Sequence, residues 1–416
     1  MSRFQCLFMM TVFSLSTVAA DGQDWCRWRG PNGNSISTET GWSASALVPA
    51  PKIRWAAEVG LGYSAVSVQG NRLYTMGHED GKDTVFCLSA KDGRELWHYT
   101  YPCKPGSYAG PRATPVCDDA QVYTMSREGL LLCLESATGT IRWQKELCNE
   151  ANGMIPTWGI GTSVILVDDL VVVNVGKCGI ALKKDSGKIV WQSPKGKCGY
   201  ASPVLYGVKG SQAMVMFGQK GLYGVEARTG KLLWEKEWLT TNDENSADPI
   251  VDGSRVYVSS IYSVGAAVFD MANPTTNLWQ NTNLVNKFST NVLYKGKLYG
   301  VHGNTGSRNG REQGMLCCVD FETGRLEWEE CIGIGSLIMV DEKLIVLNEK
   351  GMLFIAKATP DGYKELAKGQ VLEKGDDKRE AKGKCWTAPT FSRGRLYCRN
   401  DRGRIVCIDL TEQGPQ

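Results

Sequence analysis

The sequence lacks several features that mark common classes of protein. It has almost no excess of charge, because 47 Lys and Arg residues face 44 Asp and Glu residues, so we expect no nucleic-acid partner. It has only three histidines and no paired His or Cys ligand spacing, which disfavours a zinc site. No P-loop or G-x-S-x-G motif occurs. Hydrophobic residues almost nowhere recur with the period of a helix, so the sequence pattern favours a β-rich chain.

The N-terminus predicts export. Arg3 precedes an apolar run over residues 4–15, and Ala19 and Ala20 supply small residues for cleavage, so residues 1–20 are expected to be a signal peptide. No later segment has about 20 consecutive apolar residues, so no membrane insertion is expected. Cys26 lies too far downstream for a lipid anchor. We therefore expect a periplasmic or secreted protein, in which loss of Cys6 leaves 14 of the 15 cysteines with an undetermined pairing.

A repeat of about 45 residues dominates the rest of the chain. Its clearest mark is a turn with glycine followed by tryptophan, as in ATGTIRW and ETGRLEW. Between successive tryptophans lie a small-residue start and alternating strands such as NRLYTM, separated by Gly-containing turns. Four short strands per repeat predict the blades of a β-propeller.

Eight repeat units can be counted, and they begin at Tyr63, Arg112, Gly159, Tyr200, Ser246, Phe288, Gly335 and Trp386. The eighth unit has only three strands, and the segment KIRWAAEV around Trp55 supplies a fourth. We predict an all-β, eight-bladed propeller of four-stranded antiparallel blades, closed by this N-terminal strand. The expected organisation is a signal peptide (1–20), a lead segment (21–52), the propeller (53–410) and a tail (411–416).

The regular placement of the tryptophans predicts a structural role. We expect them to wedge between neighbouring blades rather than to bind a ligand; they are Trp55, Trp97, Trp143, Trp191, Trp234, Trp279 and Trp328.

The repeat resembles a known family. The pattern A-x-D-x-x-T-G-x-x-x-W, met in part over residues 133–143, 224–234 and 318–328, is similar to the tryptophan-docking motif of PQQ-like (quinoprotein-type) eight-bladed propellers. The stretches WCRWRGPNG, GPRATP, PTWG and CWTAP resemble those of secreted bacterial PQQ-binding-like propeller proteins. More distant relatives are BamB, a non-catalytic propeller, and the quinoprotein alcohol dehydrogenases. The resemblance covers residues 25–410 and implies a fold rather than an activity.

Adjacent Cys317 and Cys318 raise the question of redox chemistry, because quinoprotein alcohol dehydrogenases carry such a pair in their active sites. Cys318 occupies the same repeat position as Cys87, Cys133 and Cys407, and buried cysteine behaves as a small hydrophobic residue. Cys317 should then point to the opposite face of the same strand. We expect a structural pair.

The candidate binding site is the mouth of the central channel, where the inner strands begin. The residues expected there are Tyr63, Arg112, Trp158, Tyr200, Asn245, Phe288, His302 and Trp386. Such a set suits a small planar anion, with Arg112 pairing a carboxylate. The alternative is that these side chains only fill the channel.

Asp243 and Glu244 offer oxygen ligands for Ca²⁺ near the same mouth. The alternative is a solvated loop, because the spacing is not that of an EF-hand.

Two functions remain. The first is a monomeric, non-catalytic propeller that binds a ligand or a protein partner at its mouth. The second is a PQQ- and Ca²⁺-dependent dehydrogenase that oxidises an alcohol, polyvinyl alcohol or a sugar, with a carboxylate near Asp243 or Glu244 as base. The resemblance alone suggests PQQ and Ca²⁺, whereas the absence of a recognisable catalytic set favours the first function.

Overall fold

The computed structural model describes residues 22–208, 211–262, 264–303, 313–373 and 384–411. The expected signal peptide and all but the first residue of the expected tail lie outside these ranges. Across them, no helix is long and apolar enough to cross a membrane.

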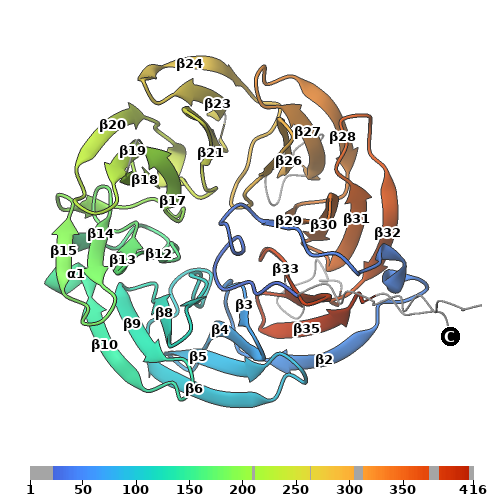
Figure 1. Ribbon diagram of the computed structural model, residues 1–416, viewed down its shortest axis with the longest axis horizontal. Helices are drawn as coiled ribbons and strands as arrows, with labels where there is room; N and C mark the ends of the chain where they lie inside the picture. Colours follow the sequence, from blue (N-terminus) through green and yellow to red (C-terminus); the bar gives the residue numbers. More distant parts are fainter. Residues whose placement is uncertain (1–21, 209–210, 263, 304–312, 374–383, 412–416) are drawn as a thin grey trace, which may run out of the picture.

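Eight blades, each of four antiparallel strands, are arranged around a common centre and form a closed ring (Figure 1). This confirms the predicted eight-bladed propeller. Blade one consists of β3 (Ser67–Gln69), β4 (Arg72–Glu79), β5 (Lys82–Ser89) and β6 (Glu95–Pro102), and blade two of β7 (Val116–Cys117), β8 (Gln121–Met125), β9 (Leu130–Glu135) and β10 (Ile141–Glu146). Blade three consists of β12 (Ile165–Val167), β13 (Leu170–Val173), β14 (Ile180–Lys183) and β15 (Ile189–Gln192), and blade four of β17 (Val204–Val208), β18 (Ser211–Phe217), β19 (Gly221–Glu226) and β20 (Leu232–Glu237).

The last four blades repeat the same order of strands. Blade five consists of β21 (Ile250–Asp252), β22 (Arg255–Ser260), β23 (Gly265–Asp270) and β24 (Asn273–Asn281), and blade six of β25 (Val292–Tyr294), β26 (Lys297–His302), β27 (Met315–Asp320) and β28 (Leu326–Cys331). Blade seven consists of β29 (Gly335–Val340), β30 (Lys343–Asn348), β31 (Met352–Lys357) and β32 (Glu365–Gln370), and blade eight of β33 (Thr390–Ser392), β34 (Arg395–Arg399) and β35 (Arg404–Asp409) with β2 (Ile53–Glu58).

The ring closes as predicted. β2 pairs antiparallel with β35, with Trp55 opposite Cys407, so the N-terminal strand is the outer strand of blade eight. Buried Arg399 of β34 fixes this blade to blade one, because its guanidinium donates hydrogen bonds to the carbonyl oxygens of Ser64 (2.8 Å) and Met76 (2.7 Å).

The lead segment adds structure that the repeat did not predict. β1 (Ile36–Ser37) pairs parallel with β29 and extends blade seven at its inner edge. The remaining short elements are β11 (Gly153–Met154), which pairs with β16 (Gly196–Lys197), the helix α1 (Leu147–Glu150) and the 3₁₀ turns η1 (Ala44–Leu47) and η2 (Thr241–Asp243).

The core of the described chain is divided among the blade interfaces. Eight buried clusters each join two neighbouring blades. Cys318 packs with Trp328 between blades six and seven, whereas Cys317 packs with Tyr257 between blades five and six. The two thiols therefore occupy opposite faces of β27, as predicted, which follows from strand alternation.

The repeat tryptophans contact the next blade through one geometry. Trp143 donates its indole N–H to the Lys184 carbonyl oxygen (2.8 Å), and its ring lies against Gly187, whose φ is +65°. Glycine adopts this φ without strain, and its missing side chain leaves room for the ring. The same indole-to-carbonyl bond is made by Trp55, Trp97, Trp191, Trp279 and Trp328.

Trp234 departs from this geometry and donates to the Tyr206 hydroxyl (3.0 Å). The turn between β23 and β24 of the next blade has no glycine at the docking position. The contact between a tryptophan ring and a glycine of positive φ is therefore missing at this interface.

Candidate functional site

A cavity of about 380 Å³ opens at the channel mouth. Six of the eight residues that we expected at the mouth line it: Tyr63, Arg112, Trp158, Tyr200, Phe288 and Trp386. Each lies in the connection that leads into the first strand of a blade, so the ring symmetry brings together residues that are far apart in the sequence.

The aromatic side chains of the mouth cavity form one connected group around Trp386. The Tyr63 ring stacks on Trp386 at 5.7 Å between centroids and 21° between planes, and Phe288 lies 5.1 Å away. Tyr108, which follows β6, contacts Trp386 at 6.0 Å and meets the edge of Trp158 at 5.8 Å. Such a wall suits a flat apolar or aromatic group.

Arg112 supplies positive charge inside this aromatic wall. Its guanidinium lies 5.8 Å from the Tyr63 ring centroid and donates to the carbonyl oxygens of Ser107 (3.2 Å) and Tyr108 (3.1 Å). Burial, followed by the repulsion of Arg127, lowers the pKa of Arg112 to about 10, so it is charged at neutral pH.

Two buried donors of the cavity are unused. Among the described residues, neither Arg112 Nη1 nor Trp158 Nε1 has a hydrogen-bond partner. A buried donor without a partner is costly.

Asn245 and His302 lie outside the lining of the mouth cavity. The Asn245 amide is fully buried and donates to the carbonyl oxygens of Gly218 (2.9 Å) and Gln219 (3.0 Å). His302 is also buried, and its Nδ1 accepts the backbone N–H of Val285 (3.0 Å). Both side chains hold loops in place beside the mouth cavity.

The residues proposed for Ca²⁺ do not converge. Asp243 accepts a hydrogen bond from Gln219 Nε2 (2.7 Å), whereas Glu244 lines the mouth cavity and accepts one from the Tyr262 hydroxyl (3.4 Å). Across the described residues, no three His, Cys, Asp or Glu side chains are grouped as metal ligands. Because Ca²⁺ takes about six to eight oxygen ligands, the described donors do not fit such a site, and we derive no chemistry through it.

The floor of the mouth cavity comes from the lead segment. Residues 25–33, here called the plug, cross the channel, where Trp25 pairs with Val68 of β3 through two backbone hydrogen bonds of 2.9 Å. Trp28 lines the mouth cavity, and its indole N–H donates to the Asp248 carboxylate (2.7 Å). Figure 1 shows this blue segment over the centre of the ring.

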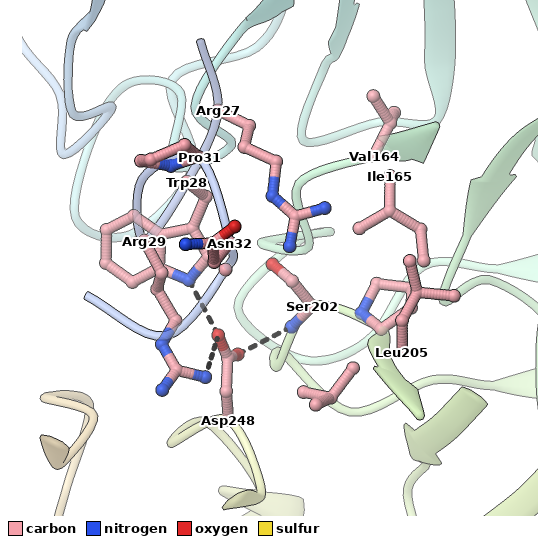
Figure 2. Close-up of a pocket in the computed structure, with 13 residues that line it drawn as sticks. Arg27, Trp28, Arg29, Pro31, Asn32, Val164, Ile165, Ser202, Leu205 and Asp248 are labelled. Atoms are coloured by element: carbon pink, nitrogen blue, oxygen red, sulfur yellow. Dashed lines mark hydrogen bonds and ion pairs between the residues drawn. The ribbon is translucent and has the colours of Figure 1, made fainter. Parts of the chain in front are cut away.

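Asp248 is the anchor of the plug. Its carboxylate also accepts the backbone N–H of Ser202 (2.8 Å) and lies 3.7 Å from Arg29 Nη1 (Figure 2). Both charged side chains are buried. Burial raises the pKa of Asp248 and lowers the pKa of Arg29, because each charge has lost its water.

Sequence reasoning missed several residues that line the mouth cavity, among them Trp28, Tyr108, Tyr262 and Lys287. Tyr262 and Lys287 could have been predicted, because loops and blade connections on one face of the propeller form the mouth. Tyr262 lies in the loop between β22 and β23, and Lys287 lies in the connection between β24 and β25. Trp28 could not have been predicted, because no repeat predicts where the lead segment crosses the ring.

Comparison with known proteins gives a consistent family. The profile of the family described as outer membrane protein assembly factor BamB matches residues 81–330. The BamB of Escherichia coli (strain K12) is 25% identical over 372 residues, covering 73% of this chain and 88% of its own length. That of Moranella endobia (strain PCIT) is 25% identical over 304 residues, covering 69% and 70%.

Solved structures agree on the fold. BamB from Moraxella catarrhalis superimposes with a TM-score of 0.58 at 15% identity, covering 87% of this chain and 99% of its own. A quinohemoprotein alcohol dehydrogenase from Comamonas testosteroni gives 0.66 at 11% identity, covering 96% and 82%. At such identities the similarity concerns the fold alone.

Proposed function

Because the chain belongs to the PQQ-like propeller family described as outer membrane protein assembly factor BamB, we propose that it is an exported, non-catalytic scaffold whose mouth cavity binds a protein partner. By analogy with the family description, the partner would belong to outer-membrane protein assembly, and the chain would work in the periplasm.

The mouth cavity carries this proposal. It combines an aromatic wall around Trp386 with Arg112, whose Nη1 is buried and has no partner in the described part of the chain. Interface centres favour aromatic and arginine residues, because they bury much surface and make directional hydrogen bonds. A partner that inserts a side chain with a flat face and an anionic or carbonyl oxygen would use both features.

A planar dianion tests whether the cavity binds such a group. We expect 2,6-naphthalenedicarboxylate to quench the tryptophan fluorescence of the mature protein saturably, because Trp158 and Trp386 lie in the wall. Arg112→Gln should weaken this binding by about tenfold, which is the effect of losing one charged hydrogen bond.

Arg228→Gln is the matched control, because this arginine is exposed and pairs with Asp168 and Asp169 on the surface. It should leave the titration unchanged. Equal binding by the Arg112→Gln variant and the wild type would remove Arg112 from the site, and no quenching by millimolar ligand would contradict the cavity as a binding site.

We do not extend the proposal to dehydrogenase chemistry. Asp243 and Glu244 engage different partners, so the described residues supply neither a shared ion site nor an identifiable base.

A further inference from the structure

A second cavity lies deeper in the channel, beyond the plug. Its volume is about 190 Å³, and it shares Trp28, Ser202 and Asp248 with the mouth cavity. Its other walls include Ile165 of β12 and Leu205 of β17, which come later along these inner strands than the residues that line the mouth. Trp28 and Asp248 therefore separate the two cavities.

The second cavity contains more positive than negative charge. Arg27 and Arg29 line it together with a single carboxylate, Asp248. Arg29 is paired with that carboxylate at 3.7 Å and also donates to the Asn291 carbonyl oxygen (3.4 Å). One guanidinium thus remains without a counter-charge in contact.

Arg27 is that guanidinium. Figure 2 shows its side chain projecting into the cavity toward Ser202, beside Ile165. Its Nε is buried without a partner, and within the described residues its side chain makes no ion pair. Burial, reinforced by repulsion from Arg29, lowers the pKa of Arg27. Arg27 is therefore a half-buried charge without a counter-ion, and an anion bound beside it would be favoured.

The surroundings of Arg27 define the chemistry of that anion. Asn32 adds a polar amide on the plug side, whereas Val164, Ile165 and Leu205 form an apolar wall opposite. One free guanidinium matches one carboxylate through two parallel hydrogen bonds. An apolar wall beside it suits a short hydrocarbon chain.

We propose that the second cavity binds a small monocarboxylate with a short branched apolar tail, whose carboxylate pairs with Arg27. The plug would then respond to this ligand, because the same loop forms part of both cavities. The two cavities share three lining residues, but this proposal does not rest on ligand binding at the mouth.

Isovalerate is the probe, titrated into the mature full-length chain and followed by calorimetry, with inorganic phosphate in a parallel titration. We expect isovalerate to bind and phosphate to bind at least about tenfold more weakly, because phosphate lacks a tail and needs more donors. Arg27→Gln should abolish isovalerate binding, Arg27→Lys should weaken it, and Arg112→Gln at the mouth should not change it.

Leu205→Trp offers a test that keeps Arg27 in place. By filling the apolar wall it should reduce isovalerate binding in a protein with unchanged circular dichroism. Isovalerate binding that survives both Arg27→Gln and Leu205→Trp, or no binding to the wild type at 10 mM (about the limit of a useful affinity), would overturn the proposal. Equal affinity for phosphate and isovalerate would show a general anion site and contradict the monocarboxylate.

Two cysteines lie in contact where the plug meets blade two. The backbone N–H of Cys117 in β7 donates to the Cys26 carbonyl oxygen (2.9 Å), and the Cys117 thiol lies 3.4 Å from the same oxygen. A hydrogen bond between the two thiols lowers the pKa of Cys26. The same interaction with Cys26, followed by burial, raises the pKa of Cys117, so Cys26 is the more reactive thiol of the pair.

We infer that Cys26 and Cys117 form a disulfide that locks the plug to blade two when the protein meets a disulfide oxidant. With oxidised glutathione, the Cys26 thiolate attacks and releases one reduced glutathione. The Cys117 thiolate then displaces the second glutathione, so two thiols become one disulfide and their two protons end on two glutathione thiols.

Peptide mass spectrometry after incubation with oxidised glutathione tests this inference. We expect a linked pair of peptides that contain Cys26 and Cys117, absent from Cys26→Ser and Cys117→Ser and retained in the control Cys331→Ser, which alters an exposed cysteine. A stable glutathione adduct on Cys26 without linkage to Cys117 would overturn it, as would no reaction at Cys26.

Discussion

Because Asp248 anchors the plug, we expect the substitution Asp248→Asn to lower the stability of the folded protein. The carboxylate accepts the Trp28 indole N–H (2.7 Å) and the Ser202 backbone N–H (2.8 Å), and it faces Arg29 at 3.7 Å. An asparagine offers one acceptor oxygen, so one of the two donors would face an NH2 group. Arg29 would become a buried charge without a counter-charge, although it keeps its hydrogen bond to the Asn291 carbonyl oxygen. Breaking a buried pair in this way costs about 3–5 kcal/mol.

The expected loss can be measured by calorimetry. For a chain of 416 residues the entropy of unfolding near the midpoint is about 0.9 kcal/mol/K, so the cost corresponds to a fall in Tm of about 3–6 °C. Asp168→Asn is the control, because Asp168 makes an exposed pair with Arg228, and such pairs contribute about 1 kcal/mol or less.

A double-mutant cycle separates the ion pair from the other bonds. Arg29→Met removes the charge that Asp248 balances, so the double variant should be more stable than the sum of the two single effects predicts, by about 1–3 kcal/mol. Additive effects, or a fall in Tm of about 1 °C or less for Asp248→Asn, would refute the view that this pair anchors the plug.

Three further predictions concern docking, closure and chemistry. Gly187→Ala should destabilise the protein by about 2 kcal/mol more than Gly253→Ala, measured by urea unfolding, because both glycines have positive φ but only Gly187 lies against a tryptophan ring, that of Trp143; equal losses would argue against the docking seat. Arg399→Met should cost about 3 kcal/mol in the same assay, because carbonyl oxygens of blade one lose their buried donor; an unchanged midpoint would show that the ring closes without it. Adding PQQ and Ca²⁺ should produce no dye-linked oxidation of ethanol or polyvinyl alcohol, and activity that appears only with both would favour the dehydrogenase hypothesis.

The fold was predictable because its signals are local and repeated. A glycine with positive φ followed by a tryptophan marks five of the repeats, and the count of the blade starts gives the number of blades. The closing strand around Trp55 was predictable because blade eight lacked one strand. Register also placed Cys317 and Cys318 on opposite faces, since alternation in a strand leaves no other arrangement.

The site was predictable only in part. The start of each blade fixes which segment reaches the mouth, and this placed Arg112 and Trp386 correctly in the lining. It does not fix where a side chain points: Asn245 turns inward because buried loop carbonyls need donors. The plug was not predictable, since Trp28 and Asp248 meet across 220 residues of sequence with no repeat to relate them.

Site-specific photo-crosslinking in cells tests the central proposal most directly. A benzophenone side chain at Tyr262 in the mouth and one at Leu366 on the outer strand β32 sample two surfaces whose residues are equally exposed, at 38%. The account predicts a protein adduct from position 262, absent from position 366 and lost when Arg112→Gln is added. Adducts of equal yield from both positions, or an adduct at position 262 that survives Arg112→Gln and Trp386→Leu, would contradict the mouth cavity as the binding site.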